Sequence, residues 1–349
     1  MDLAHLEERA RALLERSAYD YYAGGADDEL TLADNIRAWS RLRLRPHVLR
    51  DVSTVSTATT VCGRETSMPV LVAPMAYHRL ADDEGERATA RAARRAGIVN
   101  VVSTLATCSV DDVAAAAPDA ARWFQLYVHK DRGWTEELVA KAAAAGYSAL
   151  VLTVDVPYLG FRSRDERNRF VLPEGLEMAN PGRSTPQVEG SGLAAYVASE
   201  VEPSLTPADI EWLRGLSDLP VLVKGVLRGD DARLAIAAGA VGVVISNHGG
   251  RQLDTAVATA DALVEVVAAV GGDAEVLVDG GIRRGTDIVK ALALGARAVL
   301  VGRPILWGLA TGGEDGVVDV LEGLRRQLRL ALSLCGATTP ADLTRDLIV

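Results

Sequence analysis

Eight short apolar segments recur along the chain, each separated from the next by enough residues to form a helix. They lie at residues 70–74, 100–105, 123–128, 149–155, 221–225, 243–247, 276–280 and 298–302. Nearly continuous runs of valine, isoleucine and leucine are expected of parallel strands that are buried on both faces. Helical patterns lie between them, most clearly at residues 85–96, 135–145, 230–238 and 286–294. Several of these patterns end in Ala-Gly or Leu-Gly, and glycine is the usual left-handed stop of a helix.

This alternation predicts a closed (β/α)8 barrel of the TIM type, an α/β fold with helices outside a parallel sheet. A doubly wound open sheet is the alternative, but the count of eight favours the barrel. We expect one domain over residues 1–349, with an N-terminal helical cap at 1–65, the barrel at 66–310 and further helices at 311–349. A lid loop is expected at about 175–206, because this stretch is rich in Gly, Pro and Ser and weakly patterned.

The charge balance and the cysteine content argue against several classes of protein. Lys and Arg number 37 against 47 Asp and Glu, so neither nucleic acid nor an anionic membrane is an expected partner. Three widely spaced cysteines make neither a disulfide framework nor a zinc motif, and we expect no metal site. The N-terminal segment lacks the apolar core of a signal peptide, and no apolar run approaches the roughly 18–20 residues of a membrane span. These features favour a cytoplasmic protein.

Polar residues gather where the predicted strands end. They are Ser103, Thr104, Gln125, Tyr127, Thr153, Asp155, Lys224, Ser246, Asn247, His248, Asp279 and Arg303. The carboxyl ends of the strands form the active-site face of such barrels. Glycines and arginines follow the seventh and eighth strands, at 280–283 and 302–303, where this fold commonly binds phosphate. The sequence therefore predicts a phosphate site at these two strand ends.

His248 is the candidate catalytic base, because imidazole titrates near neutral pH and two glycines leave its surroundings uncrowded. Asp155, at the end of the fourth strand, could orient His248 and stabilise its protonated form. Arg251 could hold a carboxylate through its planar fork. Lys224 ends an apolar strand, so it needs an anionic or electron-rich partner. A flavin edge and a Schiff-base carbonyl are both compatible with that lysine.

Seven motifs in order then match a known family. They are YDYYA at 19–23, VAPMA at 72–76, FQLY at 124–127, LTVDVP at 152–157, LVKG at 222–225, SNHGGRQLD at 246–254 and DGGIR at 279–283. In these motifs the chain resembles the FMN-dependent 2-hydroxy-acid oxidases and dehydrogenases, which include glycolate, lactate and mandelate or 4-hydroxymandelate oxidases. The resemblance runs from about residue 19 to residue 310.

The resemblance implies FMN as cofactor and assigns roles to matching positions. The flavin ring would contact Ala73, Pro74, Met75, Ala76, Ser103, Gln125, Thr153, Lys224 and Ser246. The ribityl chain and phosphate would be held by Asp279, Gly281, Arg283, Gly302 and Arg303. The carboxylate and hydroxyl of the substrate would bind to Tyr21, Tyr127, Arg162 and Arg251. His248 would be the base, paired with Asp155, and Tyr127 and Arg251 would also take part in catalysis.

The implied reaction is the oxidation of an (S)-2-hydroxy acid to the 2-oxo acid, with O2 or another electron acceptor reoxidising the flavin. Hydride transfer and a carbanion route both remain open. The resemblance also implies a homo-oligomer, a tetramer or an octamer. A non-oxidative FMN barrel such as type 2 isopentenyl-diphosphate isomerase is a remote alternative, since it lacks this carboxylate site. A barrel that binds flavin without catalysis is disfavoured, because it would not need buried charges.

One departure from the family pattern concerns the substrate pocket. Leu105 stands where glycolate oxidases carry a tryptophan, so we expect a pocket that admits a bulky or aromatic, mandelate-like acid. In this respect the chain is closer to 4-hydroxymandelate oxidase. A lactate- or glycolate-type substrate is the alternative, in which case Tyr77, Phe161 or the lid would fill the space beside Leu105.

Overall fold

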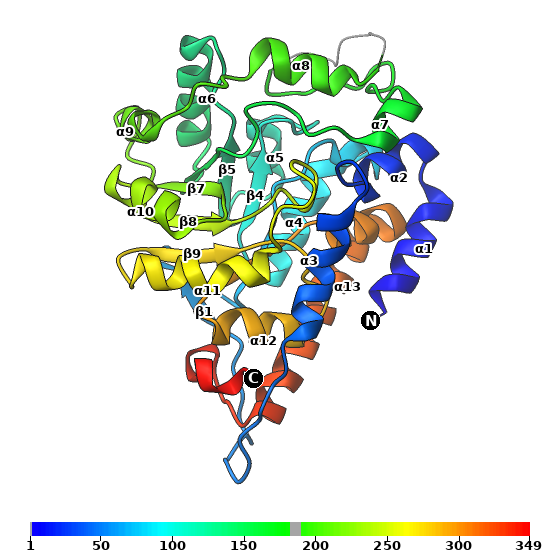
Figure 1. Ribbon diagram of the computed structural model, residues 1–349. Helices are drawn as coiled ribbons and strands as arrows, with labels where there is room; N and C mark the ends of the chain where they lie inside the picture. The colour runs from blue at the N-terminus through cyan, green and yellow to red at the C-terminus, as the bar shows by residue number, and fades with distance from the viewer. Residues whose placement is uncertain (1, 182–189) are drawn as a thin grey trace.

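The computed structural model describes residues 2–181 and 190–349 and shows a closed barrel of eight parallel strands surrounded by helices (Figure 1). The barrel strands are β3 (Val70–Val72), β4 (Asn100–Ser103), β5 (Arg122–Leu126), β6 (Leu150–Thr153), β7 (Val221–Val226), β8 (Gly242–Ile245), β9 (Glu275–Val278) and β10 (Ala298–Val301). They pair in chain order, and β10 closes the ring on β3. The predicted barrel is therefore confirmed.

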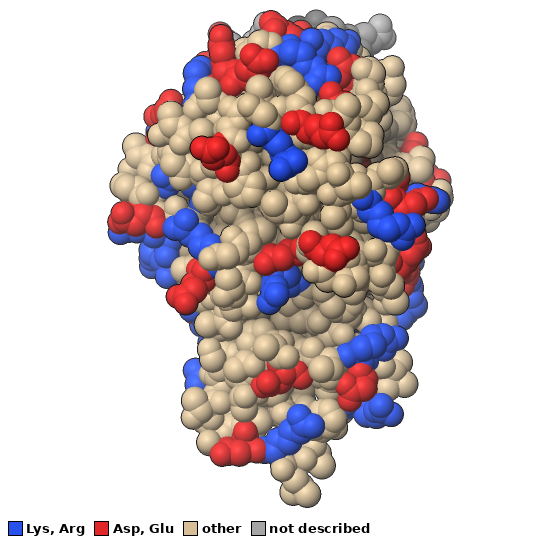
Figure 2. All heavy atoms as spheres, turned by 90° about the vertical axis from the view of Figure 1, so that its left-hand side faces the viewer, with Lys and Arg blue, Asp and Glu red and all other residues tan. Residues whose placement is uncertain are grey.

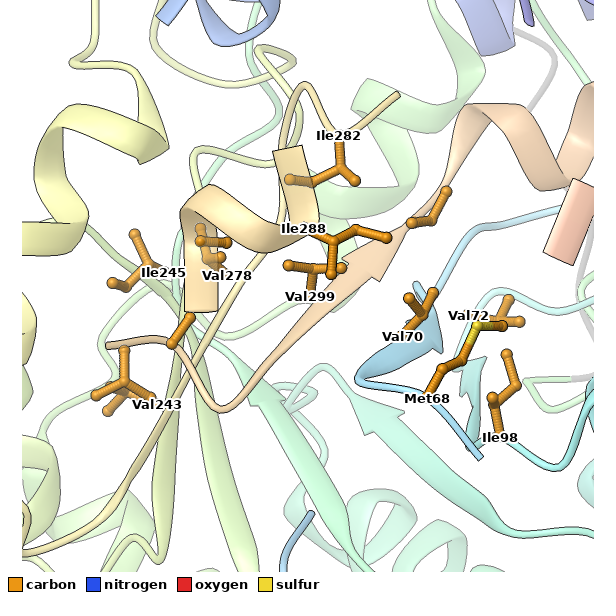
Figure 3. Close-up of a cluster of buried hydrophobic side chains, with 14 of the residues drawn as sticks. Met68, Val70, Val72, Ile98, Val243, Ile245, Val278, Ile282, Ile288 and Val299 are labelled. Atoms are coloured by element: carbon orange, nitrogen blue, oxygen red, sulfur yellow. The ribbon is translucent and has the colours of Figure 1, made fainter. Parts of the chain in front are cut away.

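Side chains of each barrel strand alternate between the surrounding helices and the barrel interior, as the period of a strand requires. On β8, Val243 and Ile245 join the core under the helices, whereas Val244 joins the interior cluster. Figure 3 shows the helix-facing side chains of β3, β8, β9 and β10 forming one apolar layer with Ile288. Both faces of the sheet are thus buried, and each fully buried valine contributes roughly 1.5–3 kcal/mol.

The helices that follow the barrel strands pack on the outside of the sheet. They are α4 (Gly85–Ala96), α5 (Val110–Ala116), α6 (Arg132–Ala144), α9 (Pro207–Arg214), α10 (Gly229–Ala237), α11 (Thr259–Val270), α12 (Gly285–Ala293) and α13 (Arg303–Cys335). The predicted glycine stops at Gly97, Gly146, Gly239 and Gly295 all have positive φ. Helix α13 bends at non-helical backbone around Gly312 and Gly313. Short 3-10 helices lie at His78–Leu80, Pro340–Asp342 and Arg345–Leu347.

The sequence suggested that the N-terminal segment forms only helices that cap one end of the barrel. The structure shows those helices and a β-hairpin as well. Helices α1 (Leu3–Leu13), α2 (Arg16–Ala23) and α3 (Leu30–Arg41) are followed by a hairpin of β1 (Thr59–Val61) and β2 (Arg64–Thr66). Val61 packs into the interior cluster, and the backbone N–H of Cys62 donates to Glu275 at the start of β9. The hairpin therefore closes the N-terminal end of the barrel. Its strands are only three residues long, too short to show a period in the sequence.

The expected lid loop contains a helix. Between β6 and β7 the chain forms α7 (Ser163–Asn168), α8 (Gly192–Glu200) and α9, and the part of the lid at 182–189 lies outside the described residues. Ser191 caps the N-terminus of helix α8, where its side chain accepts from the N–H of Ala194. Its buried Leu193, Tyr196 and Val197 have helical spacing, which the surrounding glycines and serines obscured.

The surface carries charges of both signs. Figure 2 shows lysine, arginine, aspartate and glutamate side chains in small mixed groups on one face, without a continuous basic area. Among the residues that the structure describes, no helix has the length and apolar character needed to cross a membrane.

Candidate active site

A cavity opens at the C-terminal end of the barrel, and the strand period explains which residues face it. The interior cluster contains at least one apolar residue from each strand, and the position two residues beyond the last of them again points inward. These positions are Ala73, Ser103, Gln125, Thr153, Lys224, Ser246, Asp279 and Gly302. All of them except Ser246 line a cavity of about 1210 Å³, including the solvent at its mouth. Predicted flavin-site residues thus form the floor of one cavity, together with Pro74, Met75 and Ala76.

A chain of hydrogen bonds orders one side of this floor. The Ser103 hydroxyl donates to Gln125 Oε1 at 3.1 Å, and Gln125 Nε2 donates to the Thr153 hydroxyl at 3.0 Å. The backbone N–H of Thr104 also donates to Gln125 Oε1, at 3.2 Å. The amide of Gln125 is therefore held in one orientation, with neighbouring donors and acceptors along three adjacent strands.

Lys224 lies within a buried network with Asp279. Its Nζ is 3.3 Å from Asp279 Oδ2 and donates to the Ser246 hydroxyl at 3.0 Å. Burial alone would lower the pKa of Lys224, but Asp279 and Asp155 outweigh burial and raise the pKa. The lysine therefore keeps its positive charge inside the barrel.

The structure does not bring Ser246 to the cavity surface. Its hydroxyl donates to Asp279 Oδ2 at 3.0 Å and accepts from the backbone N–H of His248 at 3.0 Å, so it lies behind Lys224. Ser246 thus supports Lys224 from beneath the cavity lining, and the flavin contact expected of Ser246 stays a prediction. The sequence could not show this, because strand period gives the inward direction but not the depth.

His248 lies beside Asp155, as predicted. Its Nδ1 is 3.0 Å from Asp155 Oδ1, and Gln252 Nε2 donates to the Asp155 carbonyl at 2.7 Å. His248 lines the cavity, whereas Asp155 lies behind it. The backbone of His248 has φ +57°, a left-handed conformation that is costly for a residue other than glycine and is concentrated at functional sites.

The charges around this pair favour a neutral imidazole and an ionised carboxylate. Burial lowers the pKa of His248, and Asp155 opposes that shift only in part. Burial would raise the pKa of Asp155, but His248 and Lys224 outweigh it and hold the pKa below its ordinary value. At neutral pH His248 can therefore accept a proton, and Asp155 can stabilise the cation that results.

Two arginines and two tyrosines surround His248. The Arg251 guanidinium lies 4.8 Å from the centre of the Tyr21 ring and donates to the Gly24 carbonyl at 2.9 Å. Arg162 is buried, and burial together with Arg251 lowers its pKa to about 10. The Nη1 atom of Arg162 is 3.8 Å from Oδ2 of Asp165. Two cations so close in a buried site are stabilised by an anion between them, which a substrate carboxylate would supply.

Tyr21 and Tyr127 remain protonated in this setting. Burial raises the pKa of both phenols, most strongly for Tyr127, where Asp155 adds to the effect. Both side chains line the cavity next to the arginines. Each can therefore donate its proton in a hydrogen bond to a bound oxygen.

Arg303, one of the predicted phosphate residues, lies next to Arg251, because both guanidinium groups donate to the Gly24 carbonyl. Arg303 donates to the carbonyls of Tyr22 at 2.9 Å and Gly24 at 2.8 Å, and burial with Arg251 and Arg283 lowers its pKa to about 9. Gly281 has φ +77°, and a Cβ there would lie 2.1 Å from the Asn35 carbonyl oxygen, so only glycine fits.

These residues fit FMN. Gly302 contributes only its backbone to the cavity. A Cβ at this position would lie 3.2 Å from Met75 Sδ, which is a tight contact. Arg283 and Arg303 are half-buried cations that line the cavity and are suited to a phosphate. Asp279 Oδ1 is buried with no hydrogen-bond partner within the described parts of the chain, so an acceptor remains for a ribityl hydroxyl. The Gln125 amide and Lys224 lie where a polar ring edge would be bound.

The cavity walls include apolar residues that the sequence did not indicate. They are Tyr22, Val156, Leu159, Leu193, Tyr196, Val197, Val201 and Leu306. Leu105 lines the same cavity, as expected. Of the three alternatives for filling the space beside Leu105, Tyr77 is buried and does not line the cavity, Phe161 is 58% exposed, and the described part of the lid segment contributes cavity lining. The spacing of Leu193, Tyr196 and Val197, together with the capping Ser191, was the local signal for α8.

Comparison with known proteins shows the family to which the chain belongs. The family model described as FMN-dependent dehydrogenase matches residues 10–349. The chain is 53% identical to an L-lactate oxidase of Nostoc sp., over 98% of this chain and 96% of the relative. It is 51% identical to 2-hydroxyacid oxidase 1 of Homo sapiens, over 98% and 94% of the two chains.

Solved structures give the same result. A crystal structure of mandelate oxidase with (S)-4-hydroxymandelic acid has 46% sequence identity and a TM-score of 0.94, covering 99% of this chain and 98% of that one. The matches span nearly the whole chain and include the strand ends that form the cavity. The protein described here therefore belongs to the FMN-dependent dehydrogenase family and is an FMN-dependent 2-hydroxy-acid oxidase.

Proposed function

We propose that this enzyme oxidises an (S)-2-hydroxy acid with a bulky or aromatic side chain to the 2-oxo acid, and that O2 then takes up the two electrons and two protons to give H2O2. The observation that carries the proposal is the pairing of His248 with Asp155 at 3.0 Å, in one cavity with Arg162 and Arg251. A base next to a carboxylate-binding site is the arrangement that removal of a proton from a 2-hydroxy acid requires.

Each protein group has a part in this reaction. Arg251 and Arg162 bind the substrate carboxylate, and Tyr127 and Tyr21 donate hydrogen bonds to its oxygens. His248 accepts the proton that the substrate loses, and Asp155 stabilises the imidazolium. When bound, FMN supplies the acceptor for the two electrons of the substrate. Lys224 places a positive charge beside the floor of the cavity, where negative charge is stabilised in a site shielded from water.

The substrate's side chain is assigned from the apolar wall. Leu105 and the α8 residues provide a lining that suits an aromatic or long aliphatic group. The structural relatives named mandelate oxidase, among them one with (S)-mandelic acid, support this choice. A lactate- or glycolate-type acid is the second candidate, because relatives of about 50% identity carry the names lactate oxidase and 2-hydroxyacid oxidase.

We also propose a cytoplasmic homo-oligomer, a tetramer or an octamer. Leu330 and Leu334 lie four residues apart on α13, and they are 60% and 66% exposed. They border the same groove as Ile36, so an apolar row faces solvent in the monomer. A second copy of the chain would cover such a row. Light scattering of the purified enzyme measures its mass in solution.

Anaerobic bleaching of the flavin tests the reaction. Enzyme loaded with FMN is mixed without oxygen with glycolate, lactate, 2-hydroxyoctanoate or either enantiomer of mandelate, and the flavin absorbance is followed. We expect fast bleaching by (S)-mandelate and, after admission of air, one H2O2 for each 2-oxo acid. No bleaching by any acid would refute the proposal. Bleaching without peroxide would indicate a dehydrogenase that uses another acceptor.

A further inference from the structure

Helix α8 is fastened to the chain segment that follows β5. The backbone N–H of Lys130 donates to the Glu200 carbonyl at 2.8 Å, and that of Glu202 donates to the Val128 carbonyl at 2.9 Å. Lys130 Nζ also donates to the Ala198 carbonyl at 2.7 Å. The C-terminal end of the helix is therefore held against the segment that follows β5, where His129 and Val201 form an isolated antiparallel bridge, and this gives the cavity wall a fixed support.

A side-chain contact reinforces this attachment. His129 is only 2% exposed, and its Nε2 lies 3.2 Å from the hydroxyl of Tyr196 on α8. The Trp134 ring meets His129 edge to face, with centroids 3.9 Å apart. His129 follows Tyr127 by two residues in the same extended segment. One short stretch thus carries both a residue of the candidate active site and the partner of a lid residue.

Tyr196 itself forms part of the cavity wall. It lines the cavity together with Leu193, Val197 and Val201, on the same lid segment. The three neighbours are aliphatic, so Tyr196 is the one aromatic ring that these four residues offer. Because its hydroxyl is bonded to His129, the position of the ring is fixed from behind. A fixed ring limits the size of the group that can occupy the adjacent space.

We propose that Tyr196 is a specificity-determining residue for the side chain of the substrate, and that His129 is the positioning residue that holds its ring. This inference rests on the proposed function of the same cavity. The carboxylate is bound by Arg251 and Arg162, so the acid enters with one end fixed and its side chain meets the apolar wall. Removing the ring leaves space that a longer or wider side chain can fill.

The expected effects are ratios between substrates. Tyr196→Ala should raise kcat/KM for 2-hydroxyoctanoate relative to lactate by about tenfold or more, since an apolar pocket discriminates about 10- to 200-fold per methylene. Tyr196→Phe keeps the ring but loses the bond between its hydroxyl and His129, so it should shift the ratio in the direction of Tyr196→Ala, by less than Tyr196→Ala and about as much as His129→Leu. His129→Leu should shift the ratio in the direction of Tyr196→Ala, whereas His129→Gln, which can still bond the hydroxyl, should stay near wild type.

Tyr147→Phe is the matched control. Tyr147 is also buried and donates to the Val110 carbonyl at 3.2 Å, but it does not line the cavity. Loss of this hydrogen bond in Tyr147→Phe should leave the kcat/KM ratios between substrates unchanged. FMN content is measured for each variant, so that differences in loading do not enter the comparison.

Binding of 2-oxo acids to the oxidised enzyme gives a second readout that needs no turnover. Flavin-spectral titrations with pyruvate and phenylglyoxylate measure the Kd of a small and of a large 2-oxo acid. Tyr196→Ala should change the ratio of these two Kd values in favour of the larger acid, as it changes the ratio of kcat/KM. The inference would be overturned if Tyr196→Ala and His129→Leu weakened the binding and turnover of small and large acids by the same factor. Such a result would show that the two residues have a merely structural role. If wild-type flavin were bleached by no 2-hydroxy acid, the proposed function would fail, and the Kd ratios would still decide the role of Tyr196.

Discussion

Replacing Asp155 by asparagine isolates the role of the carboxylate behind His248. The change keeps the size of the side chain and removes one charge that lies 3.0 Å from the imidazole Nδ1. Asp155 and His248 are 12% and 20% exposed, so water screens their interaction only partly. An opposite charge at this distance shifts a pKa by about 1–3 units, and each unit corresponds to about 1.36 kcal/mol.

This loss falls on the step in which His248 becomes positively charged. About 1.4–4 kcal/mol less stabilisation of the imidazolium slows flavin reduction by roughly 10- to 1000-fold. The pH profile changes as well. In the wild type kcat/KM declines as the pH falls through the pKa of His248, which burial holds below its ordinary value. Asp155 opposes that lowering, so Asp155→Asn should move the acid limb to still lower pH.

The assay is anaerobic stopped-flow reduction of the flavin by (S)-mandelate, together with steady-state kcat/KM from weakly acidic to alkaline pH. Asp209→Asn is the control, because Asp209 also has a lowered pKa but pairs with Arg132 away from the cavity. A reduction rate within twofold of wild type in Asp155→Asn, or an acid limb displaced to higher pH, would contradict this reasoning.

Three further substitutions test other parts of the site. His248→Ala should bind FMN nearly normally but reduce it about 10²–10⁴-fold more slowly in single-turnover experiments, and unchanged reduction would remove His248 as the base. Arg251→Lys keeps the charge and loses the planar fork, so titration with a 2-oxo acid should give a much larger Kd; an unaltered Kd would place the carboxylate on Arg162. Leu105→Trp should lower kcat/KM for mandelate relative to glycolate by about tenfold or more. If glycolate is already the better substrate of the wild type, Leu105 does not set the pocket.

The sequence by itself determined the barrel and the strand-end residues of the cavity. Both depend on local periods: buried parallel strands read as short apolar runs, and glycine stops mark the helices between them. Because the strand ends of a barrel converge, residues as distant in sequence as Asp155 and His248 could be expected side by side. The motif at 246–254 added the candidate base, His248, and the candidate carboxylate-binding residue, Arg251.

Only the tertiary structure decided what stands behind and around those residues. Ser246 supports Lys224 without facing the cavity, because depth depends on neighbouring strands. The hairpin at residues 59–66 closes the far end of the barrel through contacts such as that of Cys62 with Glu275, which no local pattern encodes. Tyr196 enters the wall because backbone and side-chain bonds fix α8 to the segment after β5. These arrangements are set by long-range packing, whereas the strands and helix stops are set by neighbours in the chain.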